Sequence, residues 1–526
     1  MTYEFLKTPA SLGRICALLG ATALAGAAAA DEVTLRSTDG TINLVGDLIS
    51  FDSEHYFLQT DLGDLRVSAE RVRCDGAGCP VFAEILPDVS IGGSDAITEG
   101  LMPLLLAGFA TDTSAEAQTE KTQTQGEFAT TLVGEDGFGD QIGTYLVRSG
   151  TSDDAFTSLL DNSIQVGMSS RRIRPDEARA LKAAGAGNMI DPSQEHIVAV
   201  DSLVVVVNPS NPIQDVSMEN LARIYAGDIT NWSELGGPDL AIEPVVQTDA
   251  GTNAVFSTGV FGAEDAALNG AYEATDNVNA ALYVDDNPGA IAYVGFAFKR
   301  GQKPLSLVSE CGIGTTPDAF SVKTEEYALF RRLYMYNRAD IDNALSADFV
   351  DFATSDAASN VILQSGFIDL GIERVVQAAN SDRGQRVQSA GTDSFEVALS
   401  TDMVEMLDTY DRLSSTFRFR TGSTNLDPRG KLDLERLANY LADQPAGTEV
   451  TFVGFADNVG AFEPNLTLSE GRAEQVRDAL MDIAGDRLDG ITLNIQGFGE
   501  ISPAACNTNE SGRLINRRVE TWISKS

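Results

Sequence analysis

Histidine is almost absent from this chain of 526 residues, in which His55 and His196 are the only two. Two histidines cannot form a multi-histidine metal cluster, and they leave little room for catalysis by a histidine base. Lysine and arginine are also scarce, since 37 of them stand against 77 aspartates and glutamates and the formal net charge is −40. Nucleic acids and anionic lipids bind to basic surfaces. The composition therefore disfavours a nucleic-acid-binding protein, and we expect neither an enzyme, a metal site nor a cofactor.

Apolar runs long enough to span a bilayer are missing beyond the N-terminus. Residues 1–30 combine a charged start containing Lys7 and Arg14, an apolar stretch at 15–27 and a final run of four alanines. This pattern is typical of a signal peptide cleaved after Ala30. Cys16 lies at the start of the apolar stretch, which disfavours a lipid anchor. We expect an exported protein of the periplasm or cell envelope.

Cysteine is rare, with five in the chain. Cys74 and Cys79 flank Asp-Gly-Ala-Gly, a turn that can bring two thiols within bonding distance. In an oxidising compartment we predict a disulfide there. Half of a zinc site is the alternative, but neither a second cysteine pair nor a nearby histidine completes it. Cys311 and Cys506 lie in different predicted domains, and the sequence leaves their pairing open.

The length predicts a multidomain protein with roughly three domains. Residues 31–86 alternate short apolar segments with glycines, which predicts a small all-β module. The sequence of this module does not indicate a function. The pattern changes to βαβ units over 88–375, where 110–127 is expected to be a polar connection. Residues 376–410 are polar, with a helical pattern over 397–407, and are predicted to be a linker. Assignment of its last part to the next domain is the alternative. Residues 411–526 form the last predicted domain.

The most informative stretch is residues 196–232. The unbroken apolar run at 203–207 predicts a strand covered on both faces. Asn-Pro-Ser-Asn-Pro ends this strand, and a helix is expected between Ser217 and Gly227. The following Gly-Asp-Ile-Thr-Asn-Trp completes a signature that closely resembles the phosphate-binding group of periplasmic solute receptors.

This resemblance covers 88–375 and implies the two-lobed α/β fold of type II periplasmic binding proteins. It implies hinges where the chain crosses between the lobes, near residues 200–204 and 289–293. It also implies that loops at the carboxyl ends of parallel strands hold phosphate or a related small oxyanion. The implied ligand residues are Ser94, Ala96, Ile97, Thr151, Ser152, Ser170, Arg171, Gln247, Gly251 and Thr252. An ABC transporter permease is the implied protein partner.

The fourth of these loops departs from the family pattern. The family usually carries Arg-x-x-Gly-Ser-Gly-Thr, and Gln247 stands here in the place of the arginine. Since a fixed guanidinium is well suited to bidentate contact with an oxyanion, its loss weakens binding or changes the ligand. Arg171 either substitutes in part or makes only a surface ion pair. A cell-envelope structural or sensing protein that no longer binds phosphate tightly is therefore the alternative function.

A second set of motifs begins at Ser414. Residues 417–426, 450–460, 465–476, 497–500 and 516–519 resemble, in family order, an OmpA-like peptidoglycan-binding domain of α/β fold. The family's Gly-His-Thr-Asp is Gly-Phe-Ala-Asp here and ends at Asp457. The resemblance implies that Asp457 holds the ammonium of peptidoglycan diaminopimelate and that Arg472 holds its carboxylate, with Asn465 and Arg517 in the same site. We expect Asp457 and Arg472 to be exposed, and the domain to tether the receptor to peptidoglycan or the outer membrane.

Overall fold

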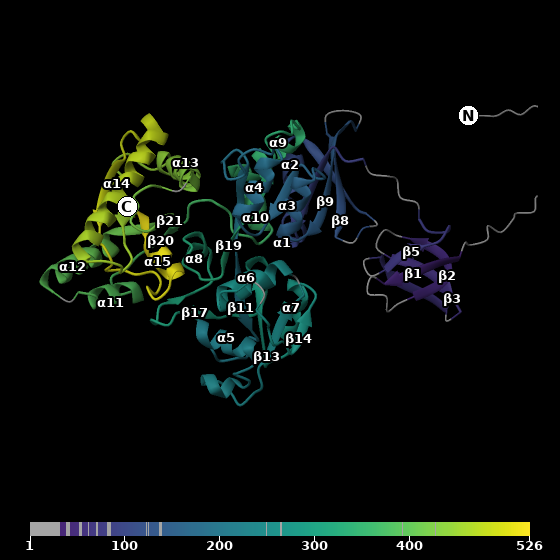
Figure 1. Cartoon of the computed structure of the whole chain (residues 1–526), viewed down its shortest axis with the longest axis horizontal. Helices are drawn as coiled ribbons and strands as arrows, with labels where there is room; N and C mark the ends of the chain where they lie inside the picture. Colours follow the sequence, from purple (N-terminus) through teal and green to yellow (C-terminus); the bar gives the residue numbers. More distant parts are fainter. Residues whose placement is uncertain are drawn as a thin grey trace, which may run out of the picture. The chain divides into compact units, whose positions relative to one another are not determined.

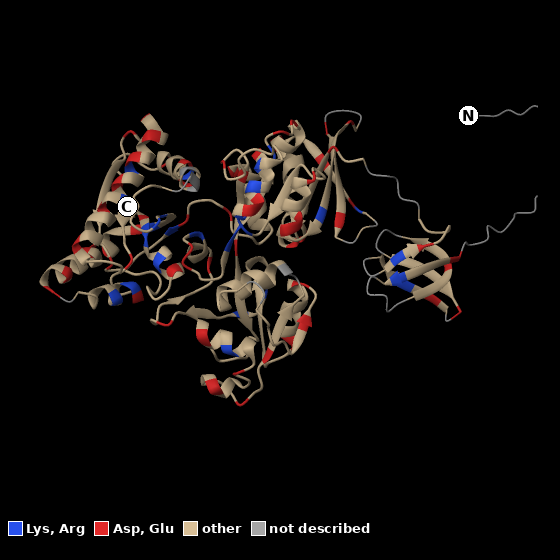
Figure 2. Ribbon diagram, viewed as in Figure 1, with Lys and Arg blue, Asp and Glu red and all other residues tan. Residues whose placement is uncertain are grey.

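The computed structural model describes residues 32–525 except 38–42, 52–54, 62, 70–71, 81–85, 123, 125, 136–138, 249, 264–265, 392 and 427. The predicted signal peptide lies outside these residues. The chain divides into two compact units, Met1–Ala83 and Glu84–Ser526 (Figure 1). Every helix in the described part of the chain is too short or too polar to cross a membrane. Acidic side chains are spread over both units (Figure 2).

The first unit contains one antiparallel sheet with the strand order β4-β3-β2-β1-β5. Its strands are β1 (Glu32–Ser37), β2 (Asn43–Phe51), β3 (His55–Thr60), β4 (Gly63–Ser68) and β5 (Val72–Asp75). Alternate residues of β1 and β3 point to one face, where Val33, Leu35, Tyr56 and Leu58 form a small core. The predicted β module is confirmed. The predicted disulfide between Cys74 and Cys79 is also present, with Cα atoms 5.8 Å apart.

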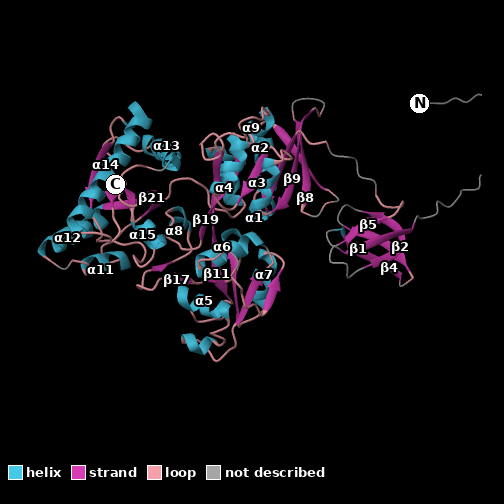
Figure 3. Cartoon of the chain, viewed as in Figure 1, coloured by secondary structure: helices cyan, strands magenta, loops and turns pink. Residues whose placement is uncertain are grey.

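In the second unit, an eleven-stranded sheet runs in the order β14-β13-β15-β11-β19-β10-β6-β9-β8-β7, with β16 paired to β11. Figure 3 shows its helices and strands. The strands are β6 (Val89–Ser94), β7 (Ala115–Lys121), β8 (Glu127–Gly134), β9 (Gln141–Gly150), β10 (Val166–Ser169), β11 (Glu195–Val207), β13 (Glu243–Gln247), β14 (Tyr272–Ala274), β15 (Ala290–Gly295), β16 (Lys303–Pro304) and β19 (Phe330–Asn337). A smaller sheet holds β12 (Asp215–Ser217), β17 (Ser306–Val308) and β18 (Gly314–Thr315).

Helices cover both faces of each half of the large sheet. In the first lobe they are α1 (Asp95–Gly100), α2 (Met102–Asp112), α9 (Ala344–Thr354) and α10 (Asp356–Gln364) on one face, and α3 (Ser152–Leu160) and α4 (Pro175–Ala183) on the other. In the second lobe they are α5 (Met218–Ala226) and α6 (Ala250–Phe261) on one face and α7 (Asn277–Asp286) on the other. The short helix α8 (Ala319–Lys323) precedes β19. The two-lobed α/β fold is confirmed.

The strand β11 carries the chain from one lobe into the other. Its first half pairs with β19 up to Ser202, and its second half pairs with β15 from Leu203 onward. Leu203, Val205 and Val207 pack toward α5 and α6, whereas Val204 and Val206 pack toward α7. The unbroken apolar run is thus buried on both faces, as predicted. α5 begins after Ser217, whose side chain accepts the Asn220 N–H, and ends at Gly227 in the left-handed conformation, also as predicted.

Two details of the two-lobed region differ from the sequence predictions. The second crossing was expected near residues 289–293, but these residues begin β15 inside the second lobe, and β19 brings the chain back beside β10 and β11. The predicted polar connection at 110–127 contains β7, which pairs with β8 at the sheet edge. Exposed polar side chains are common on an edge strand, so its composition resembles that of a loop.

The C-terminal region is a five-stranded sheet with the order β20-β21-β24-β22-β23. Its elements are β20 (Arg374–Val375), α11 (Asp382–Gln388), α12 (Ser394–Thr409), β21 (Tyr410–Arg418), α13 (Pro428–Ala442), β22 (Glu449–Gly454), α14 (Phe462–Ala484), β23 (Thr492–Gly497), α15 (Glu510–Asn516) and β24 (Arg518–Ser524). One face packs on α13 and α14. The segment predicted as a linker, 376–410, holds α11 and α12, which cover the other face through residues such as Met403 and Leu407 against Trp522. The helix expected over 397–407 is part of α12, whereas α11 was not expected. Both helices pack on the C-terminal sheet and belong to that region.

Candidate functional sites

Three of the predicted ligand loops meet at one edge of the first lobe. β6 runs parallel to both β9 and β10, so the carboxyl ends of the three strands lie side by side. Ser94 ends β6, Ser152 opens α3 after β9, and Ser170 follows β10. The Ser170 N–H donates to Ser152 Oγ at 3.1 Å, and their two hydroxyl oxygens lie 3.3 Å apart. The structure therefore brings these three serines together.

The helix that follows each strand begins at this edge. Ser94 is the N-cap of α1 and is buried, and its hydroxyl makes no hydrogen bond with the residues that the structure describes. Ala96 and Ile97, in the first turns of α1, are buried. Thr151 caps α3, because its side chain accepts the Asp154 N–H and donates to the Asp154 carboxylate. These helix N-termini provide N–H groups and a favourable field for an anion.

The fourth loop belongs to the second lobe. Gly251 and the fully buried Thr252 lie in the first turn of α6. Gln247, at the end of β13, is also buried, and its Nε2 donates to the Tyr293 carbonyl at 2.7 Å and to Asn277 Oδ1 at 3.1 Å. These bonds tie the side-chain amide of Gln247 to its own lobe.

A large cavity borders both lobes and the C-terminal region, with a volume of about 2240 Å³. Thr151, Ser152, Ser170, Arg171 and Gly251 line it. The other five predicted ligand residues are buried and are not among the residues that line the cavity: Ser94, Ala96, Ile97, Gln247 and Thr252. Among the described residues no cluster of histidine, cysteine and carboxylate side chains could hold a metal ion.

The cavity is locally basic although the chain is acidic. Eight arginines and six carboxylates line it, an excess of two positive charges in a chain of formal charge −40. The arginines are Arg171, Arg172, Arg174, Arg331, Arg332, Arg418, Arg420 and Arg517. A local excess of this sign favours an anion inside the cavity over one at the acidic surface.

Arg171 forms ion pairs within the first lobe. Its guanidinium donates to Glu177 at 2.6 Å and to Asp153, and it lies 5.0 Å from the centre of the Phe156 ring. Burial by itself would lower the pKa of Arg171, but the hydrogen bonds with Glu177 and Asp153 raise it above the ordinary value. The predicted ion pair is therefore present, and because Arg171 also lines the cavity, its contact with an oxyanion stays a prediction.

Asp457, Asn465 and Arg517 form one cluster in the C-terminal region. Asp457 Oδ2 accepts a bond of 2.7 Å from Arg517 Nη1, and Asn465 donates to the backbone carbonyl of Asp457 at 3.1 Å. Arg517 also donates to Glu510 at 2.6 Å. Arg517 lines the cavity, so this cluster adjoins the space bordered by the receptor loops.

The expectation that Asp457 and Arg472 are exposed is wrong. Asp457 is 5% exposed and Arg472 is fully buried. The guanidinium of Arg472 donates to the backbone carbonyls of Ser423, Phe455 and Arg420 at 3.0, 3.2 and 3.3 Å. Burial lowers the pKa of Arg472 to about 10, although Asp457 acts to raise it. Arg472 is buried because α14 packs directly on β22, where a Cβ on Gly454 would lie 1.9 Å from the Ser469 carbonyl oxygen.

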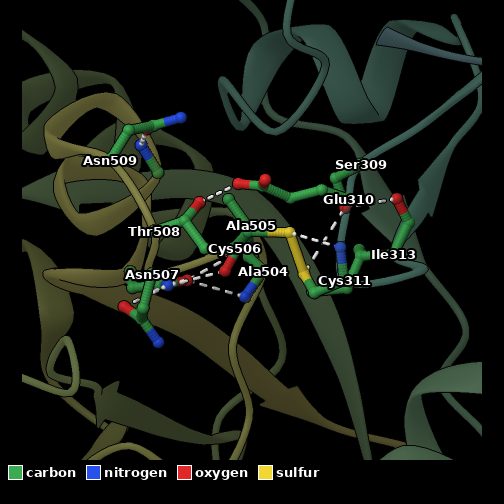
Figure 4. The surroundings of a disulfide bond; sticks show 12 residues. Ser309, Glu310, Cys311, Ile313, Ala504, Ala505, Cys506, Asn507, Thr508 and Asn509 are labelled. Atoms are coloured by element: carbon green, nitrogen blue, oxygen red, sulfur yellow. Dashed lines mark hydrogen bonds between the residues drawn. A yellow bond between two sulfur atoms is a disulfide. The ribbon is translucent and has the colours of Figure 1, made fainter. Parts of the chain in front are cut away.

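A second disulfide joins the two-lobed region to the C-terminal region (Figure 4). Cys311 and Cys506 have Cα atoms 5.7 Å apart, and the Cys311 N–H donates to the sulfur of Cys506 at 3.0 Å. Glu310 and Thr508 form a hydrogen bond beside it. The pairing that the sequence left open is thus present, and Cys506 is itself one of the residues that line the cavity.

The ion pair between Asp201 on β11 and Arg331 on β19 was not predicted from the sequence. Both side chains are buried, and Arg331 Nη2 lies 2.6 Å from Asp201 Oδ2. The available signal was two consecutive arginines, Arg331 and Arg332, inside an apolar strand of an otherwise acidic chain. Buried charges of this kind are rare without a partner.

Comparisons with known proteins match two separate parts of the chain. The PBP superfamily domain matches residues 83–357, just over half of the chain, and the OmpA family matches residues 418–517. The phosphate-binding protein PstS of Bacillus subtilis is 30% identical over 237 residues, which cover 44% of this chain and 74% of that protein. Outer membrane porin F of Pseudomonas aeruginosa is 36% identical over 112 residues, which cover 21% of this chain and 31% of the porin. The crystal structure of an ABC-type phosphate transport receptor from Vibrio cholerae aligns with 53% of this chain and 99% of its own, at 20% identity and a TM-score of 0.40.

Proposed function

The chain belongs to the PBP superfamily and carries an OmpA family domain near its C-terminus. We propose that it is an envelope receptor for phosphate or a related small oxyanion. The OmpA family domain would hold this receptor to peptidoglycan. Delivery of the oxyanion to an ABC transporter permease belongs to the same proposal. The periplasm is the proposed location, because the predicted signal peptide would export the chain there.

One observation carries the oxyanion part of this proposal. Ser152 and Ser170 of the first lobe and Gly251 of the second border the same cavity, each at or near the N-terminus of a helix or the end of a strand. Neutral hydroxyl and N–H donors arranged in this way bind small anions without requiring a basic surface. The donors come from both lobes, so closure of the lobes on the anion would complete its coordination.

Isothermal titration of the purified chain with phosphate and with other small oxyanions tests this function. Thr252→Val should weaken binding about tenfold or more, since one hydrogen bond to a charged acceptor contributes about 1.5–3 kcal/mol. Thr157→Val is the control, because Thr157 on α3 is exposed and does not line the cavity. The control should bind as the unaltered chain does. Equal affinities for all three proteins would argue against a site at α6.

The alternative function rests on Gln247. Its amide is bonded to Tyr293 and Asn277, and it supplies no positive charge where related receptors carry arginine. A structural or sensing protein of the envelope would tolerate this change. If the chain binds no oxyanion at millimolar concentration, this alternative is favoured, and recovery of binding in Gln247→Arg would identify the cause.

Sedimentation of the full chain with purified peptidoglycan sacculi tests the tether. Asp457→Asn removes the negative charge proposed to hold the diaminopimelate ammonium, and it should abolish sedimentation because charge-assisted bonds contribute about 1.5–3 kcal/mol each. Asp478→Asn is the control on α14, where Asp478 pairs only with neighbouring residues of the same helix in the described contacts. Because Asp457 is buried, its substitution can also destabilise the domain, so the thermal midpoint of each variant is measured together with its sedimentation. Sedimentation of a folded Asp457→Asn protein at the unaltered level would exclude this residue from the site.

A further inference from the structure

Arg331 is a buried guanidinium located where the two lobes meet. It lies opposite Asp201 in the register of β19 and β11, next to the point where β11 changes its pairing partner. Arg331 is 4% exposed, and Asp201 is fully buried. Arg331 Nε donates to Asp201 Oδ2 at 2.8 Å, and the Phe296 N–H donates to Asp201 Oδ1 at 3.0 Å. Asp201 thus fixes one edge of the guanidinium, and the backbone N–H of Phe296 in the second lobe fixes Asp201.

The other edge of this guanidinium has donors left over. Arg331 Nη1 is buried, yet it makes no hydrogen bond with any residue in the described part of the chain. An arginine side chain has five N–H donors in a rigid plane, and a buried donor without an acceptor is costly. Arg331 also lines the cavity bordered by Ser152, Ser170 and Gly251. An anion in that cavity would supply the acceptor.

Strand pairing places Arg331 close to the predicted ligand loops. β10 and β19 are antiparallel with Ser169 opposite Tyr334, so Ser170 follows β10 at the end of the pair where Arg331 lies. On the side of the second lobe, Asn277 accepts the Gly295 N–H at 2.9 Å and also binds the amide of Gln247. Gly295 immediately precedes Phe296, which holds Asp201. Contacts therefore connect the Asp201–Arg331 pair with the position where related receptors carry their arginine.

We propose that Arg331 supplies the guanidinium contact to the bound oxyanion in this chain, and that Asp201 is the positioning residue that orients it. The inference rests on the proposed oxyanion-binding function. Arginine suits this task because its planar group can contact a carboxylate along one edge and a tetrahedral oxyanion along the other. Although position 247 carries no arginine, the site then keeps a positive charge, because Arg331 supplies it.

The test is isothermal titration of the full chain with inorganic phosphate. The double variant Asp201→Asn/Arg331→Gln replaces the ion pair by two neutral amides of similar shape, so no buried charge is left without a partner. We expect its affinity to fall about 10- to 100-fold, as the loss of a hydrogen bond to a charged group predicts. The matched control is Arg338→Gln/Asp340→Asn, which neutralises a second pair just beyond the other end of β19, with Nη2 2.7 Å from Oδ2. Arg338 is buried but does not line the cavity, so the control should bind as the unaltered chain does.

The outcomes separate this inference from the function on which it rests. Unchanged affinity in Asp201→Asn/Arg331→Gln, with binding by the unaltered chain, would overturn the role of Arg331 alone. Failure of the unaltered chain to bind any oxyanion would overturn both. If the double variant does not fold, Arg331→Lys replaces it, since lysine keeps the charge but loses the planar set of donors. We expect Arg331→Lys to bind several-fold more weakly, and equal binding by that variant would also overturn the inference.

Discussion

Glu520 is a fully buried carboxylate on β24 that contacts three guanidinium groups. Arg383 donates to both of its oxygens at 3.0 Å, Arg518 Nε lies 2.7 Å from Oε1, and Arg412 Nε lies 3.0 Å from Oε2. Burial by itself would raise the pKa of Glu520, but the three arginines hold it well below the usual range. Arg412 also pairs with Glu326 at 2.6 Å, which extends this charge network to the receptor.

At the scale of this residue, Glu520→Gln should lower the free energy of unfolding by about 3–5 kcal/mol, because it leaves buried cations without their shared anion. Chemical denaturation at neutral pH measures the loss. The folded pKa of Glu520 lies below the ordinary value of 4.5, so its contribution is present above that pH and is lost as the pH falls toward the folded pKa. The variant should therefore lose part of the acid sensitivity. Glu449→Gln, at an exposed position of β22, is the control and should change stability by less than about 0.5 kcal/mol.

At the scale of the element, two neighbouring glycines of β6 have different surroundings. Gly93 has φ +132°, and a Cβ there would lie 2.1 Å from the Met168 carbonyl oxygen and 2.7 Å from Ala155 Cβ. A Cβ on Gly92 would instead make an ordinary contact of 3.4 Å with Ile164. Close approach of β6, β10 and α3 at Gly93 brings the serine hydroxyls of the candidate site together.

Gly93→Ala should therefore destabilise the first lobe by about 3 kcal/mol or more, because backbone strain and overpacking add to each other. Gly92→Ala in the same strand should cost about 1 kcal/mol or less. Urea unfolding of both variants measures the difference, and titration with phosphate shows whether binding weakens with it. Similar stability of the two variants would mean that β10 and α3 can move away from β6 at little cost.

At the scale of the whole molecule, the disulfide between Cys311 and Cys506 joins residues 195 positions apart. The ion pair between Glu326 and Arg412 adds a second connection between the receptor and the C-terminal region. The disulfide between Cys74 and Cys79 spans only five positions within the first unit. Cross-links that close long loops restrict the unfolded chain more than those that close short loops.

Cys311→Ser/Cys506→Ser should therefore destabilise the second unit by about 4–5 kcal/mol, against about 2 kcal/mol for the loss of the short disulfide in the first unit. Calorimetry should then resolve separate transitions for the two-lobed region and the C-terminal region. Cys74→Ser/Cys79→Ser is the control and should leave the second unit unchanged. A second unit that unfolds in the same single transition with and without Cys311–Cys506 would contradict this expectation.

Several parts of the fold and candidate site could be predicted because they depend on short stretches of sequence. The apolar run of β11 showed burial on both faces, and Ser217 and Gly227 marked the ends of α5. Ser152 and Ser170 could be placed together because β9 and β10 both run parallel to β6, and the carboxyl ends of parallel strands meet at one edge. β7 could not be predicted, since its polar residues reflect its position at the sheet edge.

By itself, the sequence determined the β module, the burial of β11 and the ends of α5, since periodicity and caps are properties of neighbouring residues. The two-lobed fold and the C-terminal α/β domain could be predicted because the order of their motifs resembles that of known families. Only the tertiary structure decided that Arg472 is buried against backbone carbonyls, that Cys311 pairs with Cys506, and that Arg331 meets Asp201. The Asp201–Arg331 pair joins residues 130 positions apart. Burial and pairing over such separations depend on which strands and helices pack together, and no local pattern of residues specifies that packing.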